Sequence, residues 1–337
     1  MSTHQAVHVE SAGAALKLVD VETTAPLRDH VRLAVSACGI CGTDRAFVGG
    51  GFPNMSWPLT PGHEIAGTIA ELGAGVDNYA VGDRVAVGWF GGHCGKCVPC
   101  RKGDFIHCQN IQVPSWQYPG GYAESVTVPA NALARIPDEL SLTEAAPMGC
   151  AGVTTYHALR ETRAMPGDRV AVLGIGGLGH LGVQFARAMG FETIAIARGA
   201  DKAEDAHALG AHHYIDSTAG DVGKAMRRLG GASVVLGTVG NAAAMAQTVG
   251  GLLPRGELIA IGVSGEPLPI SPTQLIGRGL SITGHASGTA RDIEETMQFA
   301  VLSGVRTRIQ ERPLDQAAEA YAAMEQGQAR YRMVLTV

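Results

Sequence analysis

Four cysteines within fifteen residues constrain this chain more than any other feature. Cys94, Cys97, Cys100 and Cys108 follow the spacing C-x2-C-x2-C-x7-C. Four thiolates this close together can enclose one metal ion and leave no coordination position open, which is the chemistry of a structural zinc site. An iron–sulfur cluster is the main alternative, but the ferredoxin run has three residues before its fourth cysteine and a proline after it. We therefore expect a structural zinc that pins a surface loop.

The composition excludes several classes of protein. The 337 residues include 26 Lys and Arg against 31 Asp and Glu, so the net charge of −5 gives no reason to expect a nucleic-acid partner. Hydrophobic residues make up 46%, which is too many for a disordered chain. The longest uncharged apolar stretch, residues 170–186, is shorter than the roughly 20 residues that a bilayer requires. With no signal-peptide pattern at the N-terminus, we expect a cytoplasmic protein without a membrane partner.

The pattern of apolar residues changes near residue 153. Before it, short apolar runs separated by Gly, Pro, Asn and Asp predict a β-rich domain. After it, strand candidates at 169–173, 193–196, 213–215, 233–236 and 258–261 alternate with helical segments such as 178–189 and 201–209. Strands that alternate with helices predict parallel βαβ units. The fold class is therefore α/β, with a doubly wound parallel sheet as one of two domains.

A glycine-rich turn follows the first of these later strands. Gly174, Gly176 and Gly179 form G-x-G-x-x-G, with Gly177 and Leu178 inside it, and an apolar helix begins there. The first glycine allows the turn, the second lets backbone N–H groups approach a pyrophosphate, and the third permits close packing of helix on strand. A glycine-lined turn without a ligand is the alternative, and the strand-to-helix context favours a dinucleotide site in a Rossmann domain.

Three further residues could hold a second metal ion. Cys41, His63 and Cys150 supply two thiolates and one imidazole, the ligand set of a catalytic zinc with its fourth position open. They are far apart in sequence, so they converge only if the fold brings them together. A lone buried cysteine or histidine is otherwise an ordinary core residue. The residues by themselves leave both interpretations open.

Gly62-His63-Glu64 continues to Val76 as G-H-E-x2-G-x5-G-x2-V. With Cys38-Gly-Ile-Cys41-Gly-Thr43-Asp44 before it and the four-cysteine segment after it, the chain resembles the zinc-dependent medium-chain alcohol dehydrogenases, and most closely their cinnamyl-alcohol-dehydrogenase-like branch. The resemblance implies a GroES-like catalytic domain at 1–152 and 288–337 around a Rossmann domain at 153–287. It also implies a homodimer or homotetramer, commonly joined through the edge strand at 281–284.

The same resemblance assigns roles around the second metal. It implies that Cys41, His63 and Cys150 are the catalytic zinc ligands, and that Glu64 can replace the water ligand during exchange. Asp44 is expected near His63, where such a partner orients an imidazole ligand.

Proton transfer is the part of the family pattern from which this chain departs. Thr43 matches the hydroxyl that receives the alcohol proton, but Ala46 stands where many members continue the relay with histidine. Alcohol and aldehyde interconversion is favoured because Thr43 is retained. Reduction of a C=C or C=N bond on the same scaffold is one alternative, and a non-catalytic protein that binds zinc and nucleotide is another.

The cofactor is expected to be NADP(H), with NAD(H) as the alternative. About 20 residues after the glycine turn, an acid would bind the ribose of NAD. This chain has Arg198 and Lys202 there, which could bind a 2′-phosphate or be simple solvated cations. The resemblance adds four less specific cofactor contacts: Thr154, Val239, Val263 and Arg332.

All three tryptophans of the chain lie in the β-rich half. We expect Trp57, Trp89 and Trp116 to line the substrate pocket, although core packing is the alternative for each. Aromatic walls suit apolar primary alcohols and aldehydes, aliphatic or aromatic, better than polyols.

Overall fold

The computed structural model describes residues 2–337 and divides into two compact units. Unit 1 comprises the described residues up to Val153 together with Ser287–Val337, and unit 2 comprises Thr154–Ala286. In the described part of the chain, no helix has both the length and the apolar character needed to cross a lipid bilayer.

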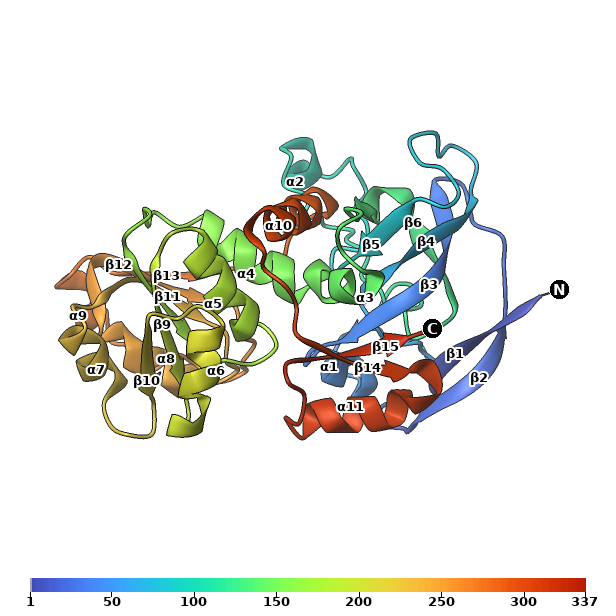
Figure 1. Ribbon diagram of the computed structural model, residues 1–337. Coiled ribbons are helices and arrows are strands. Elements are labelled where there is room, and N and C mark those ends of the chain that lie inside the picture. The colour runs from blue at the N-terminus through green and yellow to red at the C-terminus, as the bar shows by residue number, and fades with distance from the viewer. Residues whose placement is uncertain (1) are drawn as a thin grey trace. The chain divides into compact units, whose positions relative to one another are not determined.

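Unit 2 is built on a six-stranded parallel sheet (Figure 1). The strand order is β10-β9-β8-β11-β12-β13, so the sheet grows outward in both directions from its first strand, β8. This is the doubly wound order of a dinucleotide-binding sheet, and it confirms the predicted Rossmann domain. The strands are β8 (Arg169–Leu173), β9 (Glu192–Ala197), β10 (His213–Asp216), β11 (Ala232–Gly237), β12 (Leu252–Ala260) and β13 (Ser281–Gly284).

Helices connect the strands of unit 2. Helix α5 begins at Gly179 and buries Leu181, Val183 and Phe185, and it packs against β8 and β9. Side chains of Asp221 and Asn241 accept hydrogen bonds from backbone N–H groups at the start of α7 and α8, which fixes where these helices begin. The helices are α5 (Gly179–Ala188), η3 (Ala200–Lys202), α6 (Ala203–Ala208), α7 (Val222–Arg228), α8 (Ala242–Val249) and α9 (Pro272–Ile276), and α4 (Ala151–Arg160) enters the unit.

Unit 1 contains a mostly antiparallel seven-stranded sheet and a two-stranded ribbon. The larger sheet has the order β14-β15-β3-β4-β5-β7, with β6 also paired to β3, and the ribbon is β1-β2. The C-terminal strand β15 lies beside β3, so both ends of the chain contribute to one unit (Figure 1). The strands are β1 (Thr3–Val9), β2 (Leu16–Glu22), β3 (His30–Ile40), β4 (Glu64–Leu72), β5 (Arg84–Val87), β6 (Ser125–Pro129), β7 (Ala134–Arg135), β14 (Ile309–Pro313) and β15 (Arg332–Thr336).

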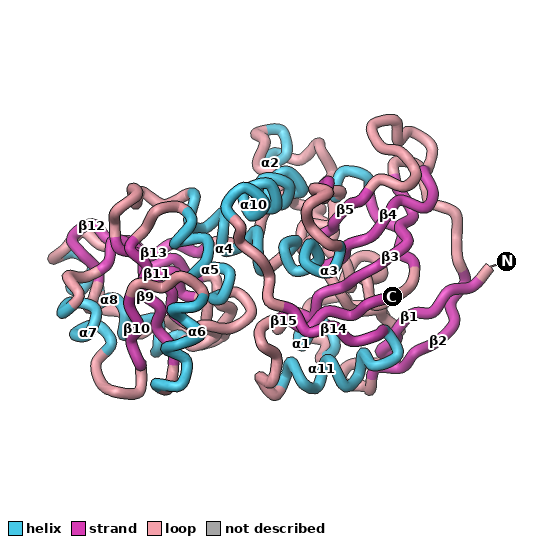
Figure 2. Tube along the Cα trace, in the orientation of Figure 1, coloured by secondary structure: helices cyan, strands magenta, loops and turns pink. Residues whose placement is uncertain are grey.

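Helices are short in most of unit 1, and the segment between β5 and β6 is loop apart from α2 (Figure 2). Strand β3 alternates buried and partly exposed residues and then becomes fully buried from Cys38 to Ile40, directly before Cys41. The helices are α1 (Asp44–Val48), α2 (Val98–Arg101), η1 (Ala130–Ala132), α3 (Leu142–Ala145), η2 (Ala146–Gly149), α10 (Ala290–Ser303), η4 (Leu314–Gln316) and α11 (Ala317–Glu325).

Candidate functional site

Two neighbouring strands of unit 1 bring Cys41 and His63 to the same edge of the sheet. Strands β3 and β4 are antiparallel, and Gly39 near the end of β3 pairs with Glu64 at the start of β4. The residues just beyond these ends therefore lie close together. Gly39 has to be glycine here, because a Cβ atom would lie 2.0 Å from Oε2 of Glu64.

Cys150 completes this group from a distant part of the sequence. It follows the short helix η2 and directly precedes α4. The Sγ atoms of Cys41 and Cys150, one ring nitrogen of His63 and one carboxylate oxygen of Glu64 all lie within 4.8 Å of one another. His63 and Glu64 are fully buried, and Cys41 is 4% exposed. The structure thus gathers the four residues that the sequence analysis proposed for the second metal.

Asp44 forms hydrogen bonds with two members of this group. Its Oδ1 atom lies 2.9 Å from Nδ1 of His63, and its Oδ2 atom accepts hydrogen bonds from the backbone N–H of Cys41 and the hydroxyl of Tyr122, both at 2.8 Å. Because Nδ1 is engaged with Asp44, Nε2 is the ring nitrogen that remains to bind a metal. That Nε2 atom is buried and has no hydrogen-bond partner among the described residues.

An unpartnered buried imidazole nitrogen beside two thiols is the donor set of a catalytic zinc site. The residues therefore fit zinc: Cys41, His63 and Cys150 would hold it, and Glu64 stands next to them.

Cys41 is the more acidic of the two thiols. Their hydrogen bond lowers the pKa of Cys41 well below that of a free thiol and raises the pKa of Cys150. Burial alone would lower the pKa of His63, but Asp44 and Cys41 together raise it above the usual range. Without a metal, a protonated His63 thus balances the charge of Asp44 and Cys41, and a metal ion would have to replace the proton on Nε2.

Glu64 is held by an arginine from the C-terminal strand. The guanidinium of Arg332 on β15 donates to both carboxylate oxygens of Glu64, and both side chains are buried. Burial raises the pKa of Glu64 to about 7, although the charge of Arg332 opposes that rise. The resemblance implies a role for Arg332 at the cofactor pyrophosphate, and in the structure its guanidinium is paired with this carboxylate.

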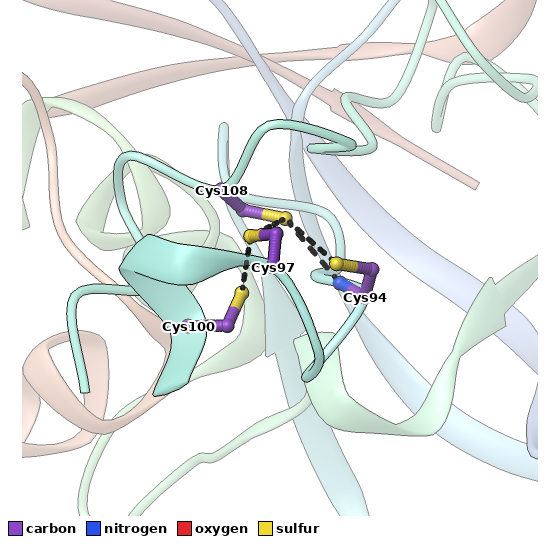
Figure 3. A group of neighbouring side chains, drawn as sticks. All are labelled: Cys94, Cys97, Cys100 and Cys108. Atoms are coloured by element: carbon purple, nitrogen blue, oxygen red, sulfur yellow. Dashed lines mark hydrogen bonds between the residues drawn. The ribbon is translucent and has the colours of Figure 1, made fainter. Parts of the chain in front are cut away.

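The four-cysteine segment forms a separate cluster (Figure 3). Cys97 and Cys100 lie at the start of and within α2, and Cys94 and Cys108 come from the flanking loops, with the four sulfur atoms turned toward one another. The Sγ distances are 3.4 Å for Cys97–Cys100, 3.9 Å for Cys97–Cys108 and 3.6 Å for Cys94–Cys108. Sulfurs at the corners of a tetrahedron around zinc, each about 2.3 Å from the metal, are about 3.8 Å apart. The cluster fits one zinc ion with no open position.

Backbone N–H groups stabilise thiolates in this cluster. The backbone N–H groups of Cys94 and Asn110 each lie 3.4 Å from Sγ of Cys108. Hydrogen bonds from the N–H groups of Lys96 and Cys97 lower the pKa of Cys94 to about 6. Desolvation, together with hydrogen bonds to Cys97 and Cys108, raises the pKa of Cys100 to about 12. Thiolates are the ligand form of cysteine, so a bound metal would have to replace the proton of Cys100.

Aromatic side chains surround His63. Trp89 meets the imidazole edge to face at 5.4 Å between ring centroids, and Phe47 lies 5.8 Å from it. Phe52 continues this aromatic wall, because it contacts Trp89 and stacks on Trp116 at 4.8 Å. Phe47 and Phe52 could not be predicted as part of this wall, because neither lies in a motif.

The remaining predicted residues of this half are placed differently. The Thr43 hydroxyl lies 3.7 Å from Sγ of Cys41 and is partly exposed. Trp57 packs against the hydrophobic core of unit 1. Cys38 is completely buried and belongs to neither of the two groups of potential metal ligands.

Unit 2 contains a cavity of about 420 Å³ at the carboxyl ends of β8, β9 and β11. Gly174 and Gly176 line it. Gly174 has a φ of +95°, and a Cβ atom on Gly179 would lie 1.8 Å from the Gly174 carbonyl oxygen, so both positions require glycine. A Cβ atom on Gly176 would meet nothing within 4 Å, so this glycine leaves open space for a ligand to approach the backbone. The cavity lies where doubly wound sheets bind nucleotides.

Both proposed phosphate-binding cations line this cavity. Arg198 and Lys202 are among its lining residues, and so is Val239. Val263 is 85% exposed and Thr154 is buried. Polar side chains that no sequence motif indicates also line this cavity: Ser217, Asn241 and Gln247.

Comparisons with known proteins agree with this architecture. Residues 28–138 match the alcohol dehydrogenase GroES-like domain, and residues 177–301 match the zinc-binding dehydrogenase domain. The chain is 40% identical to alcohol dehydrogenase patD of Penicillium expansum, over 100% of this chain and 98% of that protein. Its structure is similar to a cinnamyl alcohol dehydrogenase of Sorghum bicolor, with a TM-score of 0.91, 27% identity and coverage of 99% and 98%.

An NAD-dependent alcohol dehydrogenase has a TM-score of 0.92 to this chain at 28% identity, with 99% of each chain covered. The two domain matches, the Rossmann sheet and the full-length similarity together show that this chain belongs to the zinc-dependent medium-chain alcohol dehydrogenase family.

Proposed function

We propose that this protein is a zinc-dependent alcohol dehydrogenase and aldehyde reductase that transfers a hydride between NADP(H) and a primary alcohol or aldehyde. The observation that carries the proposal is the buried Nε2 atom of His63, which has no hydrogen-bond partner among the described residues and shares a site with Cys41 and Cys150. Family membership and the names of the relatives support the same activity.

In this reaction, residues of unit 1 would bind the metal and transfer the proton. Cys41, His63 and Cys150 hold zinc, which when bound supplies a Lewis acid that polarises a carbonyl and lowers the pKa of an alcohol. Asp44 fixes the tautomer of His63. The Thr43 hydroxyl lies beside Cys41 and accepts or returns the alcohol proton. Because Ala46 has no side chain that can carry a proton further, the transfer continues through water or a cofactor hydroxyl.

The four-cysteine cluster would hold a second zinc, giving two per chain. Its sulfur spacing matches a closed tetrahedron, so this ion would have no coordination site for a substrate. Its role would be to fix the loop between β5 and β6, where the described residues form only one short helix.

The cavity of unit 2 supports NADP(H) as the cofactor. Arg198 and Lys202 line it, and a guanidinium can bind a phosphate through two hydrogen bonds. The similarity to an NAD-dependent enzyme is compatible with NADP(H), because selectivity between NAD and NADP depends on the residues of the turn after β9.

The aromatic wall supports an apolar substrate. Phe47, Phe52 and Trp89 contact one another, and Phe47 and Trp89 also contact the ring of His63. Such a surface favours an aliphatic or aromatic primary alcohol or aldehyde over a polyol.

We also propose a homodimer or homotetramer joined through β13. This strand is the outer strand of its sheet, and Ser281, Thr283 and Gly284 are exposed. An open strand edge can pair with another copy of itself. Light scattering coupled to gel filtration tests this proposal, and a monomeric mass would contradict it.

The activity is tested by following NADPH oxidation with benzaldehyde, an enal and an imine. The zinc-loaded protein should reduce benzaldehyde, lose this activity with a strong chelator and regain it with added zinc. Turnover of the imine or of the enal C=C bond alone would assign the scaffold to the other reductase class. No turnover of any carbonyl compound by zinc-loaded protein would contradict the proposal.

The cofactor preference is tested by Arg198→Asp. The variant should shift the kcat/KM ratio from NADPH toward NADH, because a carboxylate repels the 2′-phosphate and can bind a ribose hydroxyl. Arg228→Asp is the matched control. Arg228 is exposed at the C-terminal end of α7, and its replacement changes the net charge by the same amount. An unchanged ratio in Arg198→Asp would contradict the preference for NADP(H).

A further inference from the structure

The turn that carries Arg198 is fastened to the neighbouring strand by two side chains. Asp216, the last residue of β10, accepts a hydrogen bond at 2.9 Å from the backbone N–H of Gly199. The hydroxyl of Tyr214, two residues earlier on the same strand, donates to the backbone carbonyl of Gly199. Both backbone groups of one residue are therefore held by the adjacent strand.

Gly199 is the point about which this turn could move. Its φ of +83° lies in the region that only glycine adopts readily. A Cβ atom there would also lie 2.3 Å from Oδ1 of Asp201. A glycine at this point has many accessible conformations in the absence of restraints, so the two hydrogen bonds from β10 select the one observed.

The parallel register explains how β10 reaches the turn. Asp216 pairs with Ala197, the last residue of β9, so the ends of the two strands lie side by side. The backbone N–H of Ser217 then donates to the carbonyl of Ala197 at 2.8 Å. Arg198 comes directly after this anchored pair, and both Arg198 and Ser217 line the cavity.

The carboxylate of Asp216 is committed to these contacts. Its Oδ1 atom also accepts from the backbone N–H of Thr218 at 2.8 Å and from the Thr218 hydroxyl at 2.7 Å. The hydrogen bonds from Thr218, and then that from Gly199, lower the pKa of Asp216. It therefore acts at neutral pH as an ionised acceptor that joins two loops.

We propose that Asp216 and Tyr214 are positioning residues for recognition of a 2′-phosphate on the cofactor ribose, because they hold Gly199 and thereby fix Arg198 at the cavity. The inference rests on the proposed preference for NADP(H) and extends it to two residues that do not line the cavity. Fixing a binding loop before the ligand arrives reduces the conformational entropy lost on binding. The adenine and 5′-phosphate are common to both cofactors, so their recognition should not depend on this turn.

Electrostatics and positioning predict opposite results when Asp216 is removed. A carboxylate near a bound 2′-phosphate repels it, so loss of the charge alone would tighten phosphate binding. Loss of the hold on Gly199 would weaken it. The sign of the change therefore separates a positioning role from a simple charge effect.

The test compares the binding of 2′,5′-ADP and 5′-ADP to the full chain by calorimetry, which requires no catalytic activity. Asp216→Ala and Tyr214→Phe should each weaken 2′,5′-ADP binding about tenfold while 5′-ADP changes by less than about twofold. Asp216→Asn keeps an oxygen that can accept from Gly199 and should retain most of the affinity. Asp201→Ala, which removes a neighbouring exposed acid, should leave 2′,5′-ADP binding unchanged or tighter. Thermal melting confirms that each variant is folded.

The possible results distinguish failure of the positioning role from failure of the NADP(H) preference. Wild-type protein that binds the two nucleotides equally would contradict the NADP(H) preference and the inference together. A wild-type preference for 2′,5′-ADP that survives in both Asp216→Ala and Tyr214→Phe would overturn the inference alone. Equal weakening of both nucleotides would overturn it as well, because the two residues would then be merely structural.

Discussion

The Nδ1 atom of His63 lies 2.9 Å from Oδ1 of Asp44, and both side chains are fully buried. The same carboxylate also fixes the backbone of Cys41 and the hydroxyl of Tyr122. One side chain thus orients two of the three proposed zinc ligands. A carboxylate partner of this kind tunes both the direction and the basicity of an imidazole ligand.

Replacing Asp44 should weaken the proposed catalytic zinc site without affecting the four-cysteine site. Asp44→Asn keeps the size and shape of the side chain. Its amide N–H₂ group, however, would face groups that now donate hydrogen bonds to the carboxylate. We expect zinc affinity or kcat to fall about 10- to 100-fold. Competition with a chromophoric chelator measures the affinity.

Asp104→Asn is the matched control for this change. Asp104 forms a similar pair with His107 at 2.8 Å, but that pair is exposed. It should therefore alter neither zinc site. Equal zinc retention in Asp44→Asn and Asp104→Asn would contradict the role given to Asp44.

Removing a ligand from the four-cysteine cluster should affect stability first. Cys100→Ser should lose one zinc per chain and lower the Tm, because the loop would lose its cross-link. Asn110→Ala removes only a 3.6 Å contact to Sγ of Cys94 and should keep both ions. Elemental analysis and thermal melting measure the two effects. A Cys100→Ser protein that keeps its zinc would rule out this cluster as a metal site.

The glycine turn provides two substitutions with different consequences. Gly179→Ala should lower the Tm, because its Cβ atom would lie 1.8 Å from the Gly174 carbonyl oxygen. Gly176→Ala should fold normally, because nothing lies within 4 Å, yet bind NADPH more weakly since the methyl group enters the cavity lining. Melting curves and cofactor titrations together test the pair. Unchanged NADPH affinity in Gly176→Ala would contradict the assigned cofactor cavity.

How far the sequence predicts the structure depends on whether the signal is local. The run of apolar residues predicted a strand at 169–173, where β8 lies, and the glycine spacing located the turn before α5, because both signals lie within a few neighbouring residues. The cysteine spacing likewise predicted one cluster, since four ligands within fifteen residues need little help from the rest of the chain.

Contacts between distant residues could not be predicted in this way. Arg332 reaches Glu64 across 268 positions, and no pattern in either segment indicates the partner. Phe52 lies in a loop without a motif, so its place in the aromatic wall follows only from the fold. Asp216 directly follows the strand predicted at 213–215 and belongs to no motif, and only the β9–β10 register places it beside Gly199.

An ion-pair cluster on unit 2 should make stability depend on pH. Glu192 on β9 pairs with His213 at 2.7 Å and with Arg169 at 2.8 Å, so it links three strands. The hydrogen bond from His213, aided by Arg169, lowers the pKa of Glu192. A carboxylate with a lowered folded-state pKa stabilises the fold above its unfolded pKa of about 4.3, and this stabilisation disappears as the pH falls through the folded-state pKa.

Glu192→Gln should therefore have a lower Tm than wild type at pH 7, and the difference should shrink as the pH falls below about 4. Calorimetric melting across this pH range measures it. Glu204→Gln, an exposed change on α6, should show no such trend. A gap between Glu192→Gln and wild type that stays constant down to acidic pH would contradict the assigned ion pairs.

The zinc content of Cys41→Ala, measured together with its activity, tests the central claim most directly. Wild-type protein should contain two zinc ions per chain and reduce benzaldehyde with NADPH. Cys41→Ala should contain one and lose the reduction, while Cys38→Ala, which changes a buried cysteine three residues earlier, should keep both ions. A folded Cys41→Ala protein that retains two zinc ions and full activity would contradict the assignment of Cys41, His63 and Cys150 as the catalytic metal site.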